Sequence, residues 1–187
     1  MKIDISAVGP IMTRVAGEVA DGIHVHPLHS MSYVENRLLP AVAEGAAKAD
    51  RSVDDIDLII PVFACPGDTP EEREAYVAVA RRQIAFYGST PNYAFQFDDL
   101  GFEGTTDRIR TKMKAGELDT LGELITDEML DHYALVASWD DMADKLLERY
   151  SGTAKRVVMY LGESAMRKDP VELGKWGEIA SAVRSAG

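Results

Sequence analysis

The sequence predicts an α/β protein in which parallel strands alternate with helices, and three stretches carry that prediction. Residues 3–25 have the pattern of a strand, a tight turn, a short helix and a second strand. Residues 56–64 read IDLIIPVFA, a nearly continuous apolar run that is typical of a parallel strand buried on both faces. The stretch Thr69-Pro70-Glu71-Glu72 then begins a helix, because Thr69 can cap it, Pro70 suits its first turn and Glu72 completes a capping box. Strands joined through a helix in this way are expected to be parallel, with right-handed crossovers.

The first unit is defined by its turns. Gly9-Pro10 ends the first strand, and Pro10 suits the start of a helix because its missing N–H would have no helical partner there. Asp21-Gly22 ends that helix and leads into the second strand, which opens at Ile23.

The elements between residues 26 and 61 are predicted from the spacing of apolar residues and from the positions of two prolines. Residues 26–30 form a polar loop, and an amphipathic helix is predicted from about Ser32 to Asp50. Pro40 lies inside this helix and should kink it or divide it in two. Pro61 lies inside the third strand and indicates a local irregularity or an edge position.

The helix that starts at Thr69 should end near Tyr87. Residues 88–133 break into short helical pieces with several turn signals, and we interpret them as an insertion after the third strand. A helix begins at Ser138, a fourth strand covers residues 156–161, and a final helix covers about 169–185. Four strands, each followed by a helix, are therefore expected.

Composition narrows the class of protein. The 187 residues suit a single domain over 1–187, and the net charge of −11 argues against a nucleic-acid partner, because binding phosphates requires clustered Lys and Arg. No apolar run approaches the length of a membrane span, and no signal peptide is visible. The single cysteine, Cys65, excludes an intrachain disulfide and fits a reducing, cytoplasmic location.

The Gly9-Pro10 turn is the first candidate for chemistry. Small residues at the carboxyl end of a strand allow a cofactor to approach the backbone, and the following helix N-terminus favours anions. A plain strand-to-helix turn would have the same sequence, so both interpretations stand from the residues alone.

Three histidines, His24, His26 and His29, surround the end of the second strand. In a strand His24 and His26 would point to one face, yet no nearby carboxylate or cysteine completes a metal site, so no metal is predicted. His26 and His29 are candidates for the substrate pocket, because ligand pockets of α/β proteins lie at the carboxyl ends of parallel strands. Solvated or capping loop histidines are the alternative.

Two further groups have simple structural explanations. No arrangement of a histidine and an acidic residue supports Cys65 as a catalytic nucleophile. Cys65 is therefore expected to be a buried core residue. Arg81 and Arg82 could bind an anionic group, or could complement the dipole at a helix end. No dinucleotide fingerprint, P-loop or Ser-His-Asp pattern is present, and the catalytic residues remain unknown.

Several stretches, taken in order, resemble one known family. They are AVGPIMTRVAGEVADGIHVHP, LLPAVAEGAAKADRS, PVFACPGDTPEE, RRQIAFYGSTPNY, ITDEMLDHYALVASWDDMADKLLERYSG and RVVMYL. Together they resemble the luciferase-like monooxygenase family of flavin- and deazaflavin-dependent oxidoreductases, and more narrowly its actinobacterial deazaflavin branch. The resemblance covers nearly the whole chain but matches only the second half of the family's (β/α)8 barrel.

The resemblance implies both a cofactor and a site. A deazaflavin coenzyme of the F420 type is expected, with FMN as the alternative, and Ala7, Val8, Gly9 and Pro10 are the implied cofactor-binding residues. The implied reaction is hydride transfer or monooxygenation on an unidentified small molecule. The family's acid–base groups lie on the first four strands, which have no counterpart here.

Half of a (β/α)8 TIM barrel would expose its concave sheet face and two edge strands. At about 25 cal/mol per Å², several hundred Å² of apolar sheet corresponds to on the order of 10 kcal/mol favouring a partner. A homodimer, a complementing half-barrel chain or a collapse of the insertion over the open face could provide closure. The sequence therefore supports two hypotheses: an oxidoreductase that needs a partner chain, or a non-catalytic homologue that self-associates through its open sheet and at most binds a small ligand.

Overall fold

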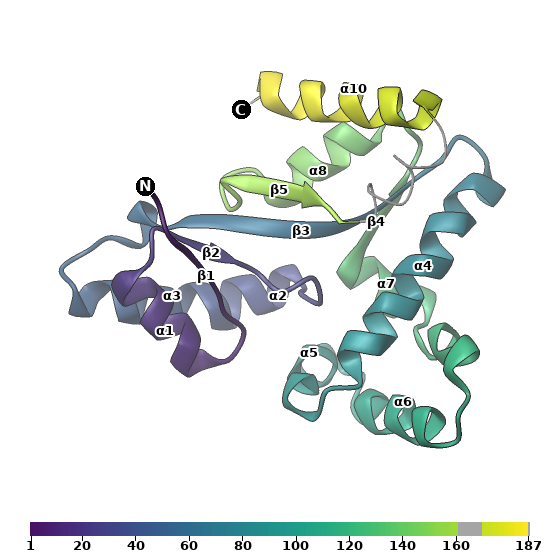
Figure 1. The fold of residues 1–187 in the computed structure, drawn as a ribbon, viewed down its shortest axis with the longest axis horizontal. Helices are drawn as coiled ribbons and strands as arrows, with labels where there is room; N and C mark the ends of the chain where they lie inside the picture. The colour runs from purple at the N-terminus through teal and green to yellow at the C-terminus, as the bar shows by residue number, and fades with distance from the viewer. Residues whose placement is uncertain (161–169, 187) are drawn as a thin grey trace. The chain divides into compact units, whose positions relative to one another are not determined.

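The computed structural model describes residues 1–160 and 170–186, and the chain forms two compact units (Figure 1). Unit 1 contains residues 1–61 and 152–158, and unit 2 contains residues 62–151 and the chain from 159 onward. The boundary falls inside the long third strand, so that strand contributes to both units. The single-domain assignment over 1–187 stays a prediction.

Unit 1 begins with a small parallel sheet. Strands β1 (Asp4–Ser6), β2 (Gly22–His24) and the first part of β3 (Asp57–Pro66) are parallel neighbours, with Ile5 opposite Ile23 and Ile23 opposite Leu58. Helix α1 (Pro10–Val19) connects β1 to β2, and α3 (Leu39–Lys48) lies between β2 and β3 in the chain. The strand–helix–strand prediction is confirmed.

Pro40 divides the second helical segment as predicted. The segment consists of α2 (Met31–Tyr33), the π-helical turn η1 (Val34–Leu38) and α3. Pro40 has no N–H to donate to the carbonyl four residues earlier, which explains why the regular α-helical ladder is interrupted just before it. A short 3-10 helix, η2 (Val53–Asp55), then leads into β3.

Helices α1 and α3 lie side by side and very close together (Figure 1). A Cβ atom on Gly17 would lie 2.3 Å from the Val42 carbonyl oxygen, and one on Gly45 would lie 1.9 Å from the Arg14 carbonyl oxygen. Both distances are far below van der Waals contact, so these two glycines set the spacing of the helices. That spacing in turn positions the Gly9-Pro10 turn at the start of α1.

Pro61 lies between two differently paired parts of β3. Residues Asp57 to Ile59 pair with β2, and residues Phe63 to Pro66 pair with β4 (Ala134–Ala137). Pro61 lies outside both the β2–β3 pairs and the β3–β4 pairs, so neither set requires the N–H that proline lacks. This break in the pairing is the local irregularity that the sequence predicts. Strand β5 (Arg156–Met159) also pairs with β3.

Unit 2 is mainly helical. Its elements are α4 (Pro70–Gly88), η3 (Pro91–Tyr93), α5 (Phe95–Asp98), α6 (Thr105–Lys114), η4 (Leu118–Leu124), α7 (Asp127–Tyr133), α8 (Met142–Tyr150) and α10 (Pro170–Ala186). Short helices fill the predicted insertion. Strand β4 was not predicted, because four residues between two helical stretches carry too little pattern to identify a strand.

The start of α4 differs slightly from the predicted capping box. The Thr69 hydroxyl accepts a hydrogen bond from the Glu72 N–H at 3.2 Å, as expected. The Glu72 carboxylate, however, accepts from the Asp68 N–H at 2.7 Å rather than from the cap residue itself. The ends of the predicted fourth strand and final helix, Leu161 and Asp169, lie outside the described residues.

Parallel strands alternating with helices confirm the predicted α/β fold class. None of the helices in residues 1–160 and 170–186 is both long enough and apolar enough to cross a membrane.

Candidate functional site

The candidate site is the loop pair that follows β1 and β2 in unit 1. After β1 the chain turns at Gly9, which has an extended backbone with φ −76° and precedes Pro10 at the start of α1. No heavy atom of the described chain beyond its immediate neighbours lies within 4 Å of a Cβ built on Gly9. The backbone of this turn is therefore open to close approach by another molecule.

The amino end of α1 offers unpaired donors. Thr13 donates from both its N–H and its hydroxyl to the Gly9 carbonyl oxygen, each at 3.0 Å. The N–H groups of Ile11 and Met12 precede the first intrahelical bond, and the described residues provide no side-chain cap for them. An anionic group held by this turn would be stabilised by the helix dipole and by these donors.

Tyr33 ties the second loop to this turn. Its buried hydroxyl donates to the Val8 carbonyl oxygen at 2.8 Å, and its N–H donates to the Ser30 hydroxyl, which caps α2. Sequence reasoning missed Tyr33. The available signal was Ser30 followed three residues later by an aromatic residue at a helix start, which indicates a cap but not a long-range contact.

His26 is held in one tautomer by its own loop. Strand β2 ends at His24, so His26 lies beyond the strand, and the expectation that both rings share a strand face is wrong. The Nδ1 atom of His26 accepts from the Leu28 N–H at 3.0 Å, which assigns the proton of the neutral ring to Nε2. Burial lowers the pKa of His26, so the ring stays neutral at pH 7.

His29 supports this loop from inside. Its side chain is buried, with 2% of its surface exposed, and its Nδ1 atom lies 3.0 Å from the His26 carbonyl oxygen. His24 is exposed and lies 3.5 Å from the Asp4 carboxylate. Within the described residues no group of three or more His, Cys, Asp or Glu side chains could hold a metal ion. The pocket roles of His26 and His29 stay predictions.

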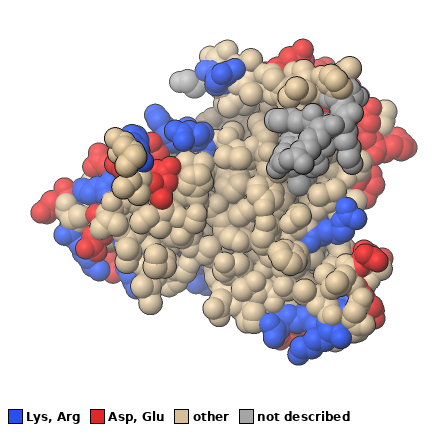
Figure 2. All heavy atoms as spheres, viewed as in Figure 1, with Lys and Arg blue, Asp and Glu red and all other residues tan. Residues whose placement is uncertain are grey.

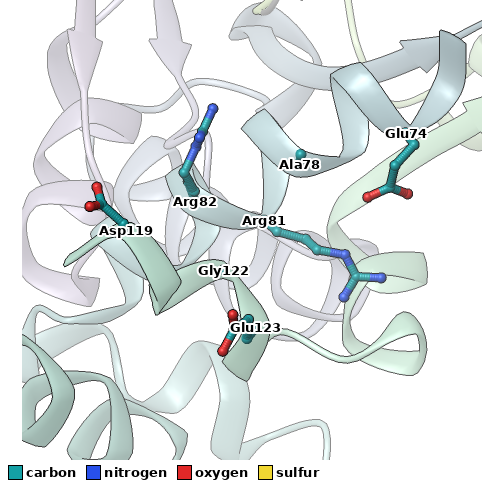
Figure 3. A pocket seen from close by; sticks show the side chains of 7 residues that line it. All are labelled: Glu74, Ala78, Arg81, Arg82, Asp119, Gly122 and Glu123. Carbon is teal, nitrogen blue, oxygen red and sulfur yellow. The ribbon is translucent and has the colours of Figure 1, made fainter. Parts of the chain in front are cut away.

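A separate cleft of about 360 Å³ lies in unit 2 between α4 and η4 (Figure 3). Its lining residues are Glu74, Ala78, Arg81, Arg82, Asp119, Gly122 and Glu123. The Arg81 guanidinium donates to the Ile125 carbonyl oxygen and to the Asp127 carboxylate. With three carboxylates in the lining, the cleft is not an anion site, and Arg81 instead fixes the insertion onto α4.

The remaining reactive groups of unit 2 are structural. Cys65 is fully buried in β3, as predicted, and burial raises the pKa of its thiol to about 12. The hydroxyl groups of Tyr87 and Tyr160 are hydrogen-bonded to each other, and burial raises the pKa of Tyr87 to about 12. The Cys65 thiol and the Tyr87 hydroxyl are therefore protonated at neutral pH.

Charged residues are distributed in a way that fits a solvated surface. Lys and Arg gather over α6 in the view of Figure 2, on a helix with the sequence TTDRIRTKMK. Lys112 on this helix pairs with Glu123 at 3.2 Å, and Arg108 donates to the Thr105 hydroxyl. These basic residues are therefore partly engaged by their own unit.

Comparison with known proteins identifies the family. The model of the luciferase-like monooxygenase family matches residues 2–156. The chain belongs to this family. The uncharacterized protein Rv1360 of Mycobacterium tuberculosis is 36% identical over 157 residues, which are 84% of this chain and 46% of that protein. The chain thus spans less than half the length of the relatives that it matches over most of its sequence.

Other relatives carry the names of oxidoreductases, and one of these names refers to coenzyme F420. The 5,10-methylenetetrahydromethanopterin reductase of Methanopyrus kandleri is 25% identical, over 83% of this chain and 43% of that protein. The F420-dependent glucose-6-phosphate dehydrogenase of Nocardia farcinica is 45% identical over 69 residues, which are 37% of this chain and 20% of that protein. These matches confirm the predicted family and support an oxidoreductase.

A solved structure gives the same fold. The coenzyme F420-dependent tetrahydromethanopterin reductase of Methanopyrus kandleri superposes with a TM-score of 0.65 at 24% identity. The match covers 84% of this chain and 44% of that one. This likeness confirms the predicted partial (β/α)8 barrel.

Proposed function

We propose that this chain binds an F420-type deazaflavin coenzyme at the carboxyl ends of β1 and β2 and forms part of a hydride-transferring oxidoreductase. The open backbone around Gly9 carries the proposal, because it leaves room for a flat coenzyme ring or a phosphate where family resemblance expects one. The F420-dependent dehydrogenase among the relatives and the F420-dependent reductase among the solved structures favour the deazaflavin over FMN. FMN with monooxygenation is the alternative within the same family.

The residues of this site would bind and orient the coenzyme. Val8, Gly9 and Pro10 would form the contact surface, with the predicted site residue Ala7 buried beneath it and Tyr33 holding the Val8 carbonyl in place. His26, neutral and protonated at Nε2, would donate a hydrogen bond toward a carbonyl oxygen of coenzyme or substrate. The coenzyme itself supplies the hydride chemistry when bound, and the protein contributes position and exclusion of water.

Turnover would require groups from a partner. The aligned part of this chain covers 46% of one relative and 43% of another. We therefore propose that a second copy or a complementing half-barrel chain supplies the acid–base groups, and we assign no catalytic residue to this chain.

A fluorescence titration of the purified chain with F420, and separately with FMN, tests the proposal. Gly9→Leu should weaken F420 binding at least tenfold without loss of stability, because the φ of Gly9 suits any residue and the added side chain enters open space. Gly174→Leu is the matched control, since Gly174 is also open but lies on α10, and it should bind normally. Failure of the chain to bind either coenzyme would overturn the proposal.

A second candidate function is a non-catalytic homologue that self-associates. Large apolar side chains remain exposed on α1, and association with a second copy would remove them from water. The absorbance of the purified protein separates the candidates: a bound deazaflavin or flavin gives a visible band, and a colourless oligomer without coenzyme affinity favours the second.

A further inference from the structure

Three charged side chains in the cleft between α4 and η4 have no hydrogen-bond or ion-pair partner among the described residues. Glu74 and Arg82 lie on α4, Asp119 lies on η4, and all three are exposed. The cleft therefore presents two carboxylates and one guanidinium to an incoming molecule.

The other two charged residues of the cleft already have partners within unit 2. Arg81 donates to the Asp127 carboxylate, and Glu123 pairs with Lys112 of α6 at 3.2 Å. In addition, η4 lies directly against α4, since a Cβ on Gly122 would be 3.3 Å from the Arg81 Cβ. These contacts fix the position of η4 beside α4, so the cleft is formed before any ligand binds.

The unpaired charges lie at opposite ends of the cleft. Glu74, Ala78 and Arg82 are spaced four residues apart, so they form one row along α4. Figure 3 shows Arg82 and Asp119 at one end of the cleft and Glu74 at the other, with Ala78 between the ends. Glu74 and Arg82 are eight residues apart, which corresponds to about 12 Å along the helix axis. A ligand can therefore meet both signs of charge at one end and a carboxylate at the other.

We propose that this cleft binds a free basic α-amino acid of the lysine or arginine type. The carboxylate of the ligand accepts two hydrogen bonds from the Arg82 guanidinium, a pairing that the planar fork of arginine favours. Its α-ammonium lies beside Asp119, and its side-chain cation pairs with Glu74. The charges of this ligand thus complement the three unpaired charges of the cleft in sign and in order.

The length of the ligand favours this class over other charged small molecules. An extended lysine spans roughly 7 Å from its carboxylate carbon to Nζ, and a hydrogen bond of about 2.9 Å follows at each end. The resulting span is close to the separation of about 12 Å between the two helix positions. A neutral amino acid would leave Glu74 unpaired, and a diamine would leave Arg82 unpaired. The cleft volume of about 360 Å³ is also within the usual range for small ligands.

Binding in this cleft is expected to be weak and independent of the coenzyme. Each ion pair is exposed to water and contributes little by itself, so the three contacts must act together, and we expect a Kd of about 1 mM. All residues of the cleft belong to unit 2, whereas the Gly9-Pro10 turn belongs to unit 1. Lysine binding can therefore be measured on the chain without coenzyme, and it does not depend on the proposed function.

Calorimetric titration of the purified chain with L-lysine, without coenzyme, tests the proposal. Saturable binding is expected, and analogues that each lack one charged group should bind about fivefold more weakly. L-norleucine lacks the side-chain cation, 1,5-diaminopentane lacks the carboxylate, and Nα-acetyl-L-lysine lacks the α-ammonium.

Two results of this titration would overturn the proposal. One is the absence of saturable binding up to about 20 mM lysine, a concentration well above the expected Kd. The other is an analogue that binds as tightly as lysine, because one of the three contacts would then be absent. Since Nα-acetyl-L-lysine also represents the C-terminal residue of a peptide, its weaker binding would assign the cleft to the free amino acid.

Substitutions assign the contacts at the two ends of the cleft. Glu74→Gln should weaken the binding of L-lysine about fivefold and leave L-norleucine unchanged, whereas Arg82→Gln should weaken L-lysine and leave 1,5-diaminopentane unchanged. Glu71→Gln is the matched control, because Glu71 is exposed on the same helix but lies outside the cleft lining, and it should not change lysine binding. Equal losses with Glu71→Gln and Glu74→Gln would mean that lysine responds only to the negative charge of the chain, and would refute the site.

Discussion

Replacing Gly45 by alanine should destabilise unit 1, although alanine favours helices. The added Cβ would lie 1.9 Å from the Arg14 carbonyl oxygen, and an ordinary contact needs about 3.4 Å, so α1 and α3 must separate by roughly 1.5 Å. Overpacking against rigid backbone costs about 3–4 kcal/mol, since neither side has a flexible group that can move away. The gain in helix propensity offsets about 1 kcal/mol. We expect a net loss of about 2–3 kcal/mol.

Denaturant unfolding followed by circular dichroism measures this change. The matched control is Gly174→Ala, in the exposed interior of α10, where a Cβ meets no described heavy atom within 4 Å and propensity alone should add up to about 1 kcal/mol. The two alanines should therefore shift stability in opposite directions. A Gly45→Ala variant as stable as the wild type would show that α1 and α3 do not pack at this distance, and that the Gly9-Pro10 turn is positioned differently.

Three further outcomes test the site and its surroundings. Tyr33→Phe removes the hydrogen bond to the Val8 carbonyl and should cost about 1–1.5 kcal/mol in denaturant unfolding, together with a several-fold weaker F420 titration. Burial holds the pKa of His26 below its ordinary 6.5, so the unfolded chain binds the proton more readily, and stability should decline as pH falls below 6.5. His26→Gln should flatten that decline, and an unchanged slope would refute the assignment. Thr69→Ala removes the cap that receives the Glu72 N–H and should lower the melting midpoint by the equivalent of about 1 kcal/mol, whereas Thr69→Ser should not.

Much of the fold could be predicted because its signals are local. Gly9-Pro10, the Thr69 cap and the apolar run of β3 each specify an element through their own residues, and Pro40 interrupts its helix by lacking one N–H. The order of these elements also led to the family. The four-residue strand β4 was missed, because its identity depends on pairing with β3 rather than on its own pattern.

The candidate site could be predicted only in part. The sequence placed the turn at residues 7–10 and the histidines beside it, but His26 proved to lie beyond the strand, in a loop whose own backbone selects its tautomer. The contact of Tyr33 with Val8 joins residues 25 positions apart, and no local pattern records such a pairing.

By itself, the sequence determined most of the strands and helices, with β4 the exception, since capping, proline and apolar periodicity act over a few residues. It also determined the family, because the order of several short stretches is specific even where each one is weak. The tertiary structure alone decided which helices touch and which face stays open. Helix α1 has apolar residues on two flanks, and only the packing of Gly17 and Gly45 shows which flank α3 covers and which stays exposed.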